Sequence, residues 1–171
     1  MLYLIGLGLI PSHLTLEAQA ALRACKKIYL EVYTSQYAQG SPADLEKITG
    51  KQIFELTRKQ VEEELAPLLE EAKSKDIGLA VFGNPLNATT HIQILLDAKK
   101  LGAKTIVVAG IGVFEFVSLS GLDRYKFGRT TTLVFHEQDY EPESFYDAII
   151  ANKKMGLHTL CLLDIKKDEE R

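Results

Sequence analysis

The segment from Leu79 to Leu96 constrains the fold of this chain more than any other stretch of its 171 residues. An apolar run rich in β-forming residues stops at Gly83-Asn84-Pro85, two threonines follow, and a helical pattern then begins. Gly, Asn and Pro are typical of a tight turn, and Thr is a good helix cap. A buried strand that ends in such a turn and leads into a helix is typical of an α/β sheet, in which ligands bind beyond the carboxyl ends of the strands.

Strand-like and helix-like patterns alternate along the chain as far as about residue 121. This alternation predicts an α/β domain at residues 1–121, with a five-stranded, mostly parallel sheet and helices on both faces. Pro67 lies inside one predicted helix and should kink or break it. The predicted strands are residues 2–7, 26–33, 52–56, 77–82 and 105–109, and the predicted helices are residues 15–24, 45–48, 58–75 and 90–100.

After residue 121 the pattern changes. Residues 129–135 and 157–164 predict two strands, and residues 142–155 predict a helix between them. Two strands and one helix are too few for an independently stable domain. Residues 122–171 are therefore predicted to form a truncated second α/β domain. The charged run at residues 166–171 is predicted to be solvated.

Composition excludes several classes of function. The net charge of -3 argues against sequence-independent binding of nucleic acid. No apolar run reaches the roughly 20 residues that a membrane-spanning helix needs. Two cysteines and four histidines without ligand spacing argue against a disulfide framework and against a metal site, so we expect a reducing, cytoplasmic environment. Cys161 lies in an apolar run and is predicted to be a buried core thiol.

Few side chains point to chemistry by themselves. Gly6-Leu7-Gly8 follows the first strand, but Pro11 replaces the third glycine of a dinucleotide-binding loop, which argues against an NAD site. His91 is predicted to be a capping or buried imidazole at the sheet edge rather than a general base. Hydroxyl groups near the end of the second strand either form an ordinary amphipathic sheet edge or line the ligand crevice; they belong to Tyr29, Tyr33, Thr34 and Ser35. No nucleophile set is evident, so the catalytic residues are not assigned.

Six blocks of sequence, taken in order, resemble one known family. Together they are similar to the diphthine synthases, which are S-adenosylmethionine-dependent methyltransferases of the tetrapyrrole-methylase superfamily. These enzymes act on the modified histidine of elongation factor 2. The resemblance covers essentially the whole chain, and the blocks are residues 4–9, 30–35, 83–91, 125–128, 142–147 and 156–165.

This resemblance implies two α/β domains with S-adenosylmethionine bound in the cleft between them, a homodimer, and no metal. It also implies methyl transfer from the cofactor sulfonium to the amine of the diphthamide precursor on elongation factor 2, which leaves S-adenosylhomocysteine. A sulfonium is already a good methyl donor, so alignment of donor and acceptor would supply most of the catalysis. By position, the implied cofactor contacts are Leu9, Asn84, Asn87, Gly112, Val113 and Leu163.

The chain departs from the family pattern at this site. Asn84 stands where the family has Asp, Gly112-Val113 stands for a Ser-Ile pair, and Ala109 stands for a His. The chain is also short at its C-terminus by comparison with the family. Two alternatives to the enzyme are therefore open. One is a non-catalytic relative that serves as a dimerisation or partner-binding module, and the other is a corrin or porphyrin methylase, against which residues 88–91 argue.

Overall fold

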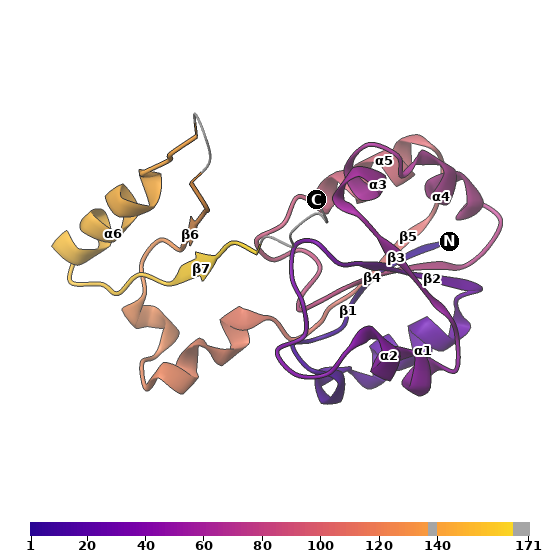
Figure 1. Cartoon of the computed structure of the whole chain (residues 1–171), viewed down its shortest axis with the longest axis horizontal. Coiled ribbons are helices and arrows are strands. Elements are labelled where there is room, and N and C mark those ends of the chain that lie inside the picture. Colours follow the sequence, from indigo (N-terminus) through magenta and orange to yellow (C-terminus); the bar gives the residue numbers. More distant parts are fainter. Residues whose placement is uncertain (137–139, 166–171) are drawn as a thin grey trace. The chain divides into compact units, whose positions relative to one another are not determined.

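The computed structural model describes residues 1–136 and 140–165 of the chain. The chain divides into two compact units, Met1–Val113 and Phe114–Arg171 (Figure 1). Nearly all of the 3-10 helix η2 (Val113–Ser120) belongs to the second unit. No helix in the described residues is long and apolar enough to cross a membrane.

A five-stranded parallel sheet with the strand order β3-β2-β4-β1-β5 forms the centre of the first unit. All five predicted strands are present, each within the predicted range. β4 is buried along its whole length, as a central strand of a parallel sheet should be. The strands are β1 (Leu2–Gly6), β2 (Lys27–Glu31), β3 (Ile53–Leu56), β4 (Ile77–Val81) and β5 (Thr105–Val108).

Helices cover both faces of this sheet, which confirms the predicted architecture (Figure 1). α1 (Leu16–Ala24) and α2 (Pro42–Thr49) pack on one face, beside the short 3-10 helix η1 (Pro11–His13). α3 (Arg58–Glu62), α4 (Ala66–Glu71) and α5 (Ile92–Lys100) pack on the other face. The helix predicted at residues 58–75 is broken into α3 and α4, and Pro67 lies in the first turn of α4, as its missing N–H favours.

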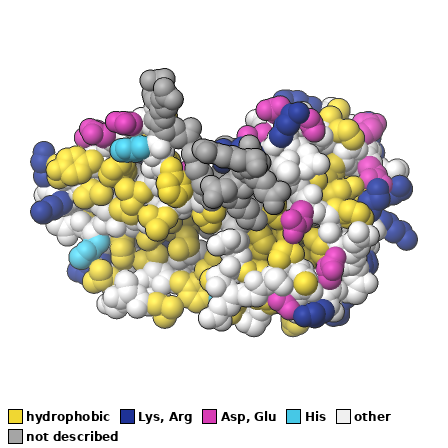
Figure 2. Space-filling model, viewed as in Figure 1, with side chains coloured by type: hydrophobic (Ala, Val, Ile, Leu, Met, Phe, Trp, Pro, Cys, Tyr) yellow, Lys and Arg dark blue, Asp and Glu magenta, His cyan; other side chains and the backbone are white. Residues whose placement is uncertain are grey.

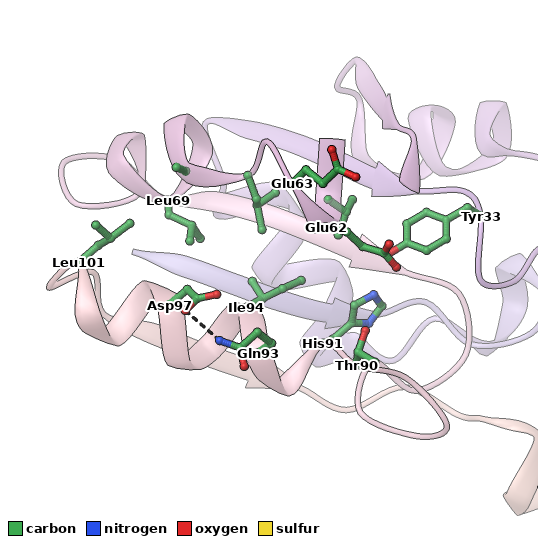
Figure 3. Close-up of a pocket in the computed structure, with 13 residues that line it drawn as sticks. Tyr33, Glu62, Glu63, Leu69, Thr90, His91, Gln93, Ile94, Asp97 and Leu101 are labelled. Atoms are coloured by element: carbon green, nitrogen blue, oxygen red, sulfur yellow. Dashed lines mark hydrogen bonds between the residues drawn. The ribbon is translucent and has the colours of Figure 1, made fainter. Parts of the chain in front are cut away.

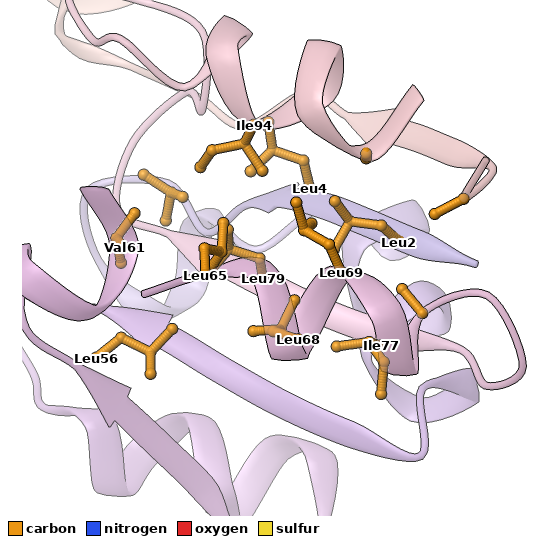
Figure 4. Packing of buried hydrophobic residues seen from close by; sticks show 14 residues of the cluster. Leu2, Leu4, Leu56, Val61, Leu65, Leu68, Leu69, Ile77, Leu79 and Ile94 are labelled. Carbon is orange, nitrogen blue, oxygen red and sulfur yellow. The ribbon is translucent and has the colours of Figure 1, made fainter. Parts of the chain in front are cut away.

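Alternation along the strands divides the core into two layers. In β4, Ile77 and Leu79 point to the α3, α4 and α5 face, whereas Ala80 points to the α1 and α2 face. Figure 4 shows the first layer, in which Leu4 and Leu79 pack between the sheet and the three helices. These two layers hold the sheet rigid, and the turns at its carboxyl edge are built on that support.

The second unit is smaller and consists of η2, η3 (Arg124–Lys126), β6 (Thr131–Leu133), α6 (Ser144–Lys154) and β7 (Cys161–Leu163). β6 and β7 pair in parallel, so the two predicted strands and the predicted helix are present. The Asn152 side chain accepts from the backbone N–H of Arg129 and donates to its carbonyl and to the Thr159 hydroxyl, which ties α6 to the chain on either side.

Cys161 is only half-buried, so the prediction of a buried core thiol was wrong at this position. The second unit also exposes large apolar side chains, among them Leu119, Met155 and Leu163, and Figure 2 shows hydrophobic side chains over the visible face of this unit. A short two-stranded sheet covers less apolar surface than the five-stranded sheet of the first unit, which explains why an apolar run is not fully buried here. The solvated run predicted at residues 166–171 lies outside the described residues.

Candidate functional site

Three strand ends meet at the carboxyl edge of the first sheet with almost no space between their backbones. A Cβ added to Gly6 would lie 2.4 Å from the Gly110 nitrogen and 2.7 Å from the Gly83 oxygen. A Cβ added to Gly110 would lie 2.1 Å from the same Gly83 oxygen. Only glycine allows β1, β4 and the segment after β5 to approach so closely.

The turns after β1 and β4 are also bonded to each other. Gly8 and Gly83 exchange backbone hydrogen bonds of 3.2 and 2.8 Å across an isolated bridge. Both glycines have positive φ, at 78° and 72°, a conformation that other residues rarely adopt. The chain leaves β1 for α1 on one face and leaves β4 for α5 on the other, which is the topology at which α/β sheets form a ligand crevice, and the region between these turns is called the crevice below.

The structure brings most of the predicted cofactor residues together here. A Cβ at Gly83 would lie 3.7 Å from Leu9 Cδ2 and 3.8 Å from Gly112 Cα. Asn84 follows Gly83 directly, and the backbone N–H of Asn87 donates to the Asn84 carbonyl at 3.3 Å. The remaining two are Val113, which ends the first unit beside Gly112, and Leu163, which belongs to the second unit, where it ends β7 with its side chain exposed.

Asn84 links the turn after β4 to the segment after β5. Its side-chain amide donates to the Gly110 carbonyl at 3.2 Å, and its side-chain oxygen accepts from the Leu86 backbone N–H at 3.1 Å. An Asp at this position could accept from Leu86 but, when ionised, could not donate to Gly110. The departure from the family pattern therefore has a local structural role: the amide joins two walls of the crevice.

The turn continues through a strained residue to the start of α5. Ala88 has φ of +55°, which costs free energy for a residue with a Cβ. The Thr89 hydroxyl accepts from the His91 backbone N–H at 2.9 Å, and His91 occupies the N-cap position of α5 without capping through its own side chain. The helix therefore begins at Ile92, two residues later than predicted.

His91 and Glu31 form a buried polar pair beside this turn. Each residue is only 1% exposed, and His91 Nε2 lies 3.6 Å from Glu31 Oε2. Glu31 also accepts hydrogen bonds from the backbone N–H groups of Tyr33 and Thr34 and from the Thr34 hydroxyl. The expectation that His91 is a buried imidazole at the sheet edge is confirmed. The importance of Glu31 was missed, although an acidic residue that ends an apolar strand was a usable signal.

A pocket of about 410 Å³ opens behind His91, between α5 and the α3–α4 segment (Figure 3). Tyr33 is one of the residues that line this pocket. Burial, together with the nearby Glu31 and Glu62 carboxylates, raises the pKa of its phenol, which therefore stays neutral. Of the hydroxyl-bearing residues considered for the ligand crevice, Tyr33 lines this pocket. None of the predicted cofactor residues lines it, so this pocket is distinct from the glycine-rich turns.

Classes of chemistry that depend on a metal or a cysteine find little support in the described part of the chain. Among residues 1–136 and 140–165 no group of three or more His, Cys, Asp or Glu side chains is arranged to hold a metal ion. Burial raises the pKa of the Cys25 thiol to about 11, so it stays protonated and is a poor nucleophile. The backbone of the glycine-rich turns, with Leu9 and Asn84, offers the groups that could hold a cofactor.

Comparison with known proteins agrees with this architecture. The family model for tetrapyrrole (corrin/porphyrin) methylases matches residues 1–170. A diphthine synthase of Methanocaldococcus jannaschii is 42% identical over 99% of this chain and 66% of its own length. A diphthine methyl ester synthase of Homo sapiens is 41% identical over 99% of this chain and 60% of its own length.

A crystal structure of a diphthine synthase superimposes with a TM-score of 0.89 at 34% identity, covering 99% of this chain and 67% of that one. The chain thus spans about two thirds or less of the length of the two curated relatives. The match nevertheless extends along both units and includes the glycine-rich crevice. The chain belongs to the tetrapyrrole (corrin/porphyrin) methylase family, in its diphthine synthase branch.

Proposed function

We propose that this chain transfers a methyl group from S-adenosylmethionine to the amine of the modified histidine of elongation factor 2, a step of diphthamide biosynthesis. The observation that carries the proposal is the 41–42% identity to diphthine synthases and diphthine methyl ester synthases over 99% of the chain. The crevice supports it, since Leu9, Asn84 and Gly112 lie around Gly83 at the carboxyl edge of the sheet.

The residues at the crevice suit a cofactor of this kind. Gly8 and Gly110 allow the turns to pack against other parts of the chain, since an added Cβ would lie 2.4 Å from His13 Cβ and 2.1 Å from the Gly83 oxygen, and the turns present main-chain polar groups at the sheet edge. Leu9 offers apolar contact to a ring, and Asn84 fixes the spacing between two of the turns. When bound, the cofactor supplies a methyl group on a positively charged sulfur, which leaves readily.

The protein's part in this reaction is alignment. With the cofactor bound, its methyl carbon would accept the lone pair of the acceptor, and the carbon–sulfur bond would break with its electrons going to sulfur, so that S-adenosylhomocysteine would be the product. The acceptor amine must be unprotonated, and a proton is lost to solvent after each of the first two transfers to a primary amine. Holding donor and acceptor in line supplies a large part of the barrier reduction without a catalytic acid or base. Such a mechanism does not need the nucleophile set that the sequence lacks.

The name of one relative indicates a second possible acceptor. The Homo sapiens relative is a diphthine methyl ester synthase, and a methyl ester forms when a carboxylate is methylated. The same donor and the same alignment serve either acceptor. We place the substrate protein in the cytoplasm and expect the chain to work there as a homodimer.

The test is methyl transfer to purified elongation factor 2 that carries the unmethylated diphthamide precursor. Incubation with labelled S-adenosylmethionine should place label on that residue, and mass spectrometry should show the added methyl groups. Mild alkali removes a methyl ester but not an N-methyl group, so alkali treatment separates the two acceptors. Absence of label on the precursor, with label present when a full-length relative is used, would refute the proposal.

A further inference from the structure

Glu31 and His91 form a buried pair to which the proposed function gives no part. Glu31 ends β2, and His91 lies between β4 and α5, immediately before the helix. Because β2 and β4 are neighbours in the sheet, the pair lies between the segments that follow these two strands. Placing a carboxylate and an imidazole where each is 1% exposed costs free energy unless their polar atoms are well bonded. An apolar pair of similar size would be less costly, which raises the question of what the polar pair achieves.

The His91 ring is bonded to the turn that follows β4. Its Nδ1 lies 3.1 Å from the Pro85 carbonyl oxygen. A carbonyl only accepts, so Nδ1 carries the hydrogen and donates. Nε2 then faces Glu31 Oε2 at 3.6 Å, with no hydrogen-bond partner for Nε2 among the described residues.

The Pro85 carbonyl that His91 contacts belongs to the turn that contains Asn84 and Asn87. Pro85 follows Asn84, whose amide bonds to Gly110 across the crevice. The same turn contains Ala88 with its positive φ, so it stores strain and needs external contacts to keep its shape. The His91 side chain makes such a contact with the carbonyl of Pro85.

The His91 side chain is almost wholly enclosed by protein, with 2% of its surface exposed. It is one of the residues that line the pocket between α5 and the α3–α4 segment (Figure 3). On the Glu31 side, the carboxylate is itself fixed by the backbone N–H groups of Tyr33 and Thr34, at 2.6 and 2.7 Å. The hydrogen bond from Nδ1 to Pro85 therefore fixes the ring orientation, and the Glu31 carboxylate lies beside the other nitrogen without a hydrogen bond to it.

We propose that His91 is a positioning residue that holds the Pro85 carbonyl and so keeps the turn at residues 84–87 in the conformation that binds the cofactor. This inference rests on the proposed function, because it assigns the turn to cofactor binding. It goes beyond that function by naming a residue that acts through the turn and does not touch the cofactor.

Two variants of the 171-residue chain and one control separate positioning from packing. His91→Leu keeps the bulk but removes the donor to Pro85. His91→Asn places an amide donor near the position of Nδ1. The control is Thr49→Val, which alters another buried polar residue, on the α2 side of the sheet, whose hydroxyl donates to Leu45.

Two measurements are made on each variant: the dissociation constant of S-adenosylhomocysteine by calorimetry, and hydrogen exchange of the Leu86 and Asn87 amides, which are bonded within the turn. His91→Leu should weaken binding about tenfold or more and speed exchange at both amides, since it removes one hydrogen bond to the turn. His91→Asn should restore both to within about threefold of the original chain. Thr49→Val should change neither.

Equal effects of His91→Leu and Thr49→Val, or no rescue by His91→Asn, would overturn the positioning role. Should His91→Leu not fold, His91→Asn still decides: weak binding and fast exchange in a folded His91→Asn chain would reject the role of the donor to Pro85. Failure of the original chain to bind S-adenosylhomocysteine would count against the proposed function alone. In that case exchange at Leu86 and Asn87 still decides whether His91 holds the turn.

Discussion

Replacing Gly6 with Ala tests the close approach of the Gly6, Gly83 and Gly110 backbones, on which the crevice depends. The added Cβ would lie 2.4 Å from the Gly110 nitrogen, 2.6 Å from Gly110 Cα and 2.7 Å from the Gly83 oxygen. All three atoms are backbone atoms of neighbouring segments, so no side chain can rotate away to make room. Overpacking of a well-ordered interior costs about 1–3 kcal/mol, and the need to move two backbone segments puts Gly6→Ala at about 3 kcal/mol.

Gly78→Ala is the matched control in the same sheet. Its Cβ would lie 3.2 Å from Cys25 Sγ and 3.5 Å from Ile5 Cδ1, which are side-chain atoms that can shift. We expect a loss of less than about 1 kcal/mol there. The assay is urea unfolding, with hydrogen exchange of β1 and β4 peptides to report the first unit separately. A Gly6→Ala chain within about 0.5 kcal/mol of the original, or no less stable than Gly78→Ala, would refute the reasoning.

Three further predictions concern stability and are checked by denaturant unfolding. Asn84→Asp should cost about 1–3 kcal/mol at pH 7, because a carboxylate cannot donate to the Gly110 carbonyl; a protonated carboxyl can, so the deficit should shrink as the pH falls below about 4. Hydrogen bonds from two lysines, Lys75 and then Lys27, lower the pKa of Glu71; its contribution is therefore present above the ordinary carboxyl pKa and lost as the pH falls through the lowered value. Glu71→Gln should thus cost at most about 1 kcal/mol at pH 7 and nothing in strong acid, and equal losses at both pH values would contradict this. Leu79→Ala, at a fully buried position, should cost about 3 kcal/mol, and a loss below about 1 kcal/mol would mean that β4 is not central to the core.

The sheet was predictable because its signals are local. A short apolar run between turn-forming residues, such as residues 77–82, is typical of a buried strand, and Pro67 predicts the break of the helix that contains it. Strand ends were less predictable. The strand predicted at residues 26–33 stops at Glu31, because the Glu31 carboxylate draws the N–H groups of Tyr33 and Thr34 out of the strand pairing.

The site was predictable only in part, since its contacts join residues far apart in the sequence. The resemblance assigned Asn84 to the cofactor site but gave no reason for the amide, and its bond to Gly110 is visible only in three dimensions. Glu31 could not be paired with His91 for the same reason. Cys161 was assigned to a core on the strength of its apolar neighbours, which a short two-stranded sheet does not fully bury.

Calorimetric titration of the 171-residue chain with S-adenosylhomocysteine tests the central claim most directly. A competent crevice should give a dissociation constant near micromolar, which corresponds to about -8 kcal/mol. Gly6→Ala, which forces the crevice apart, should bind more weakly under the same conditions. No heat of binding and no thermal shift at millimolar ligand would contradict the account, because a crevice that cannot hold the cofactor cannot support methyl transfer.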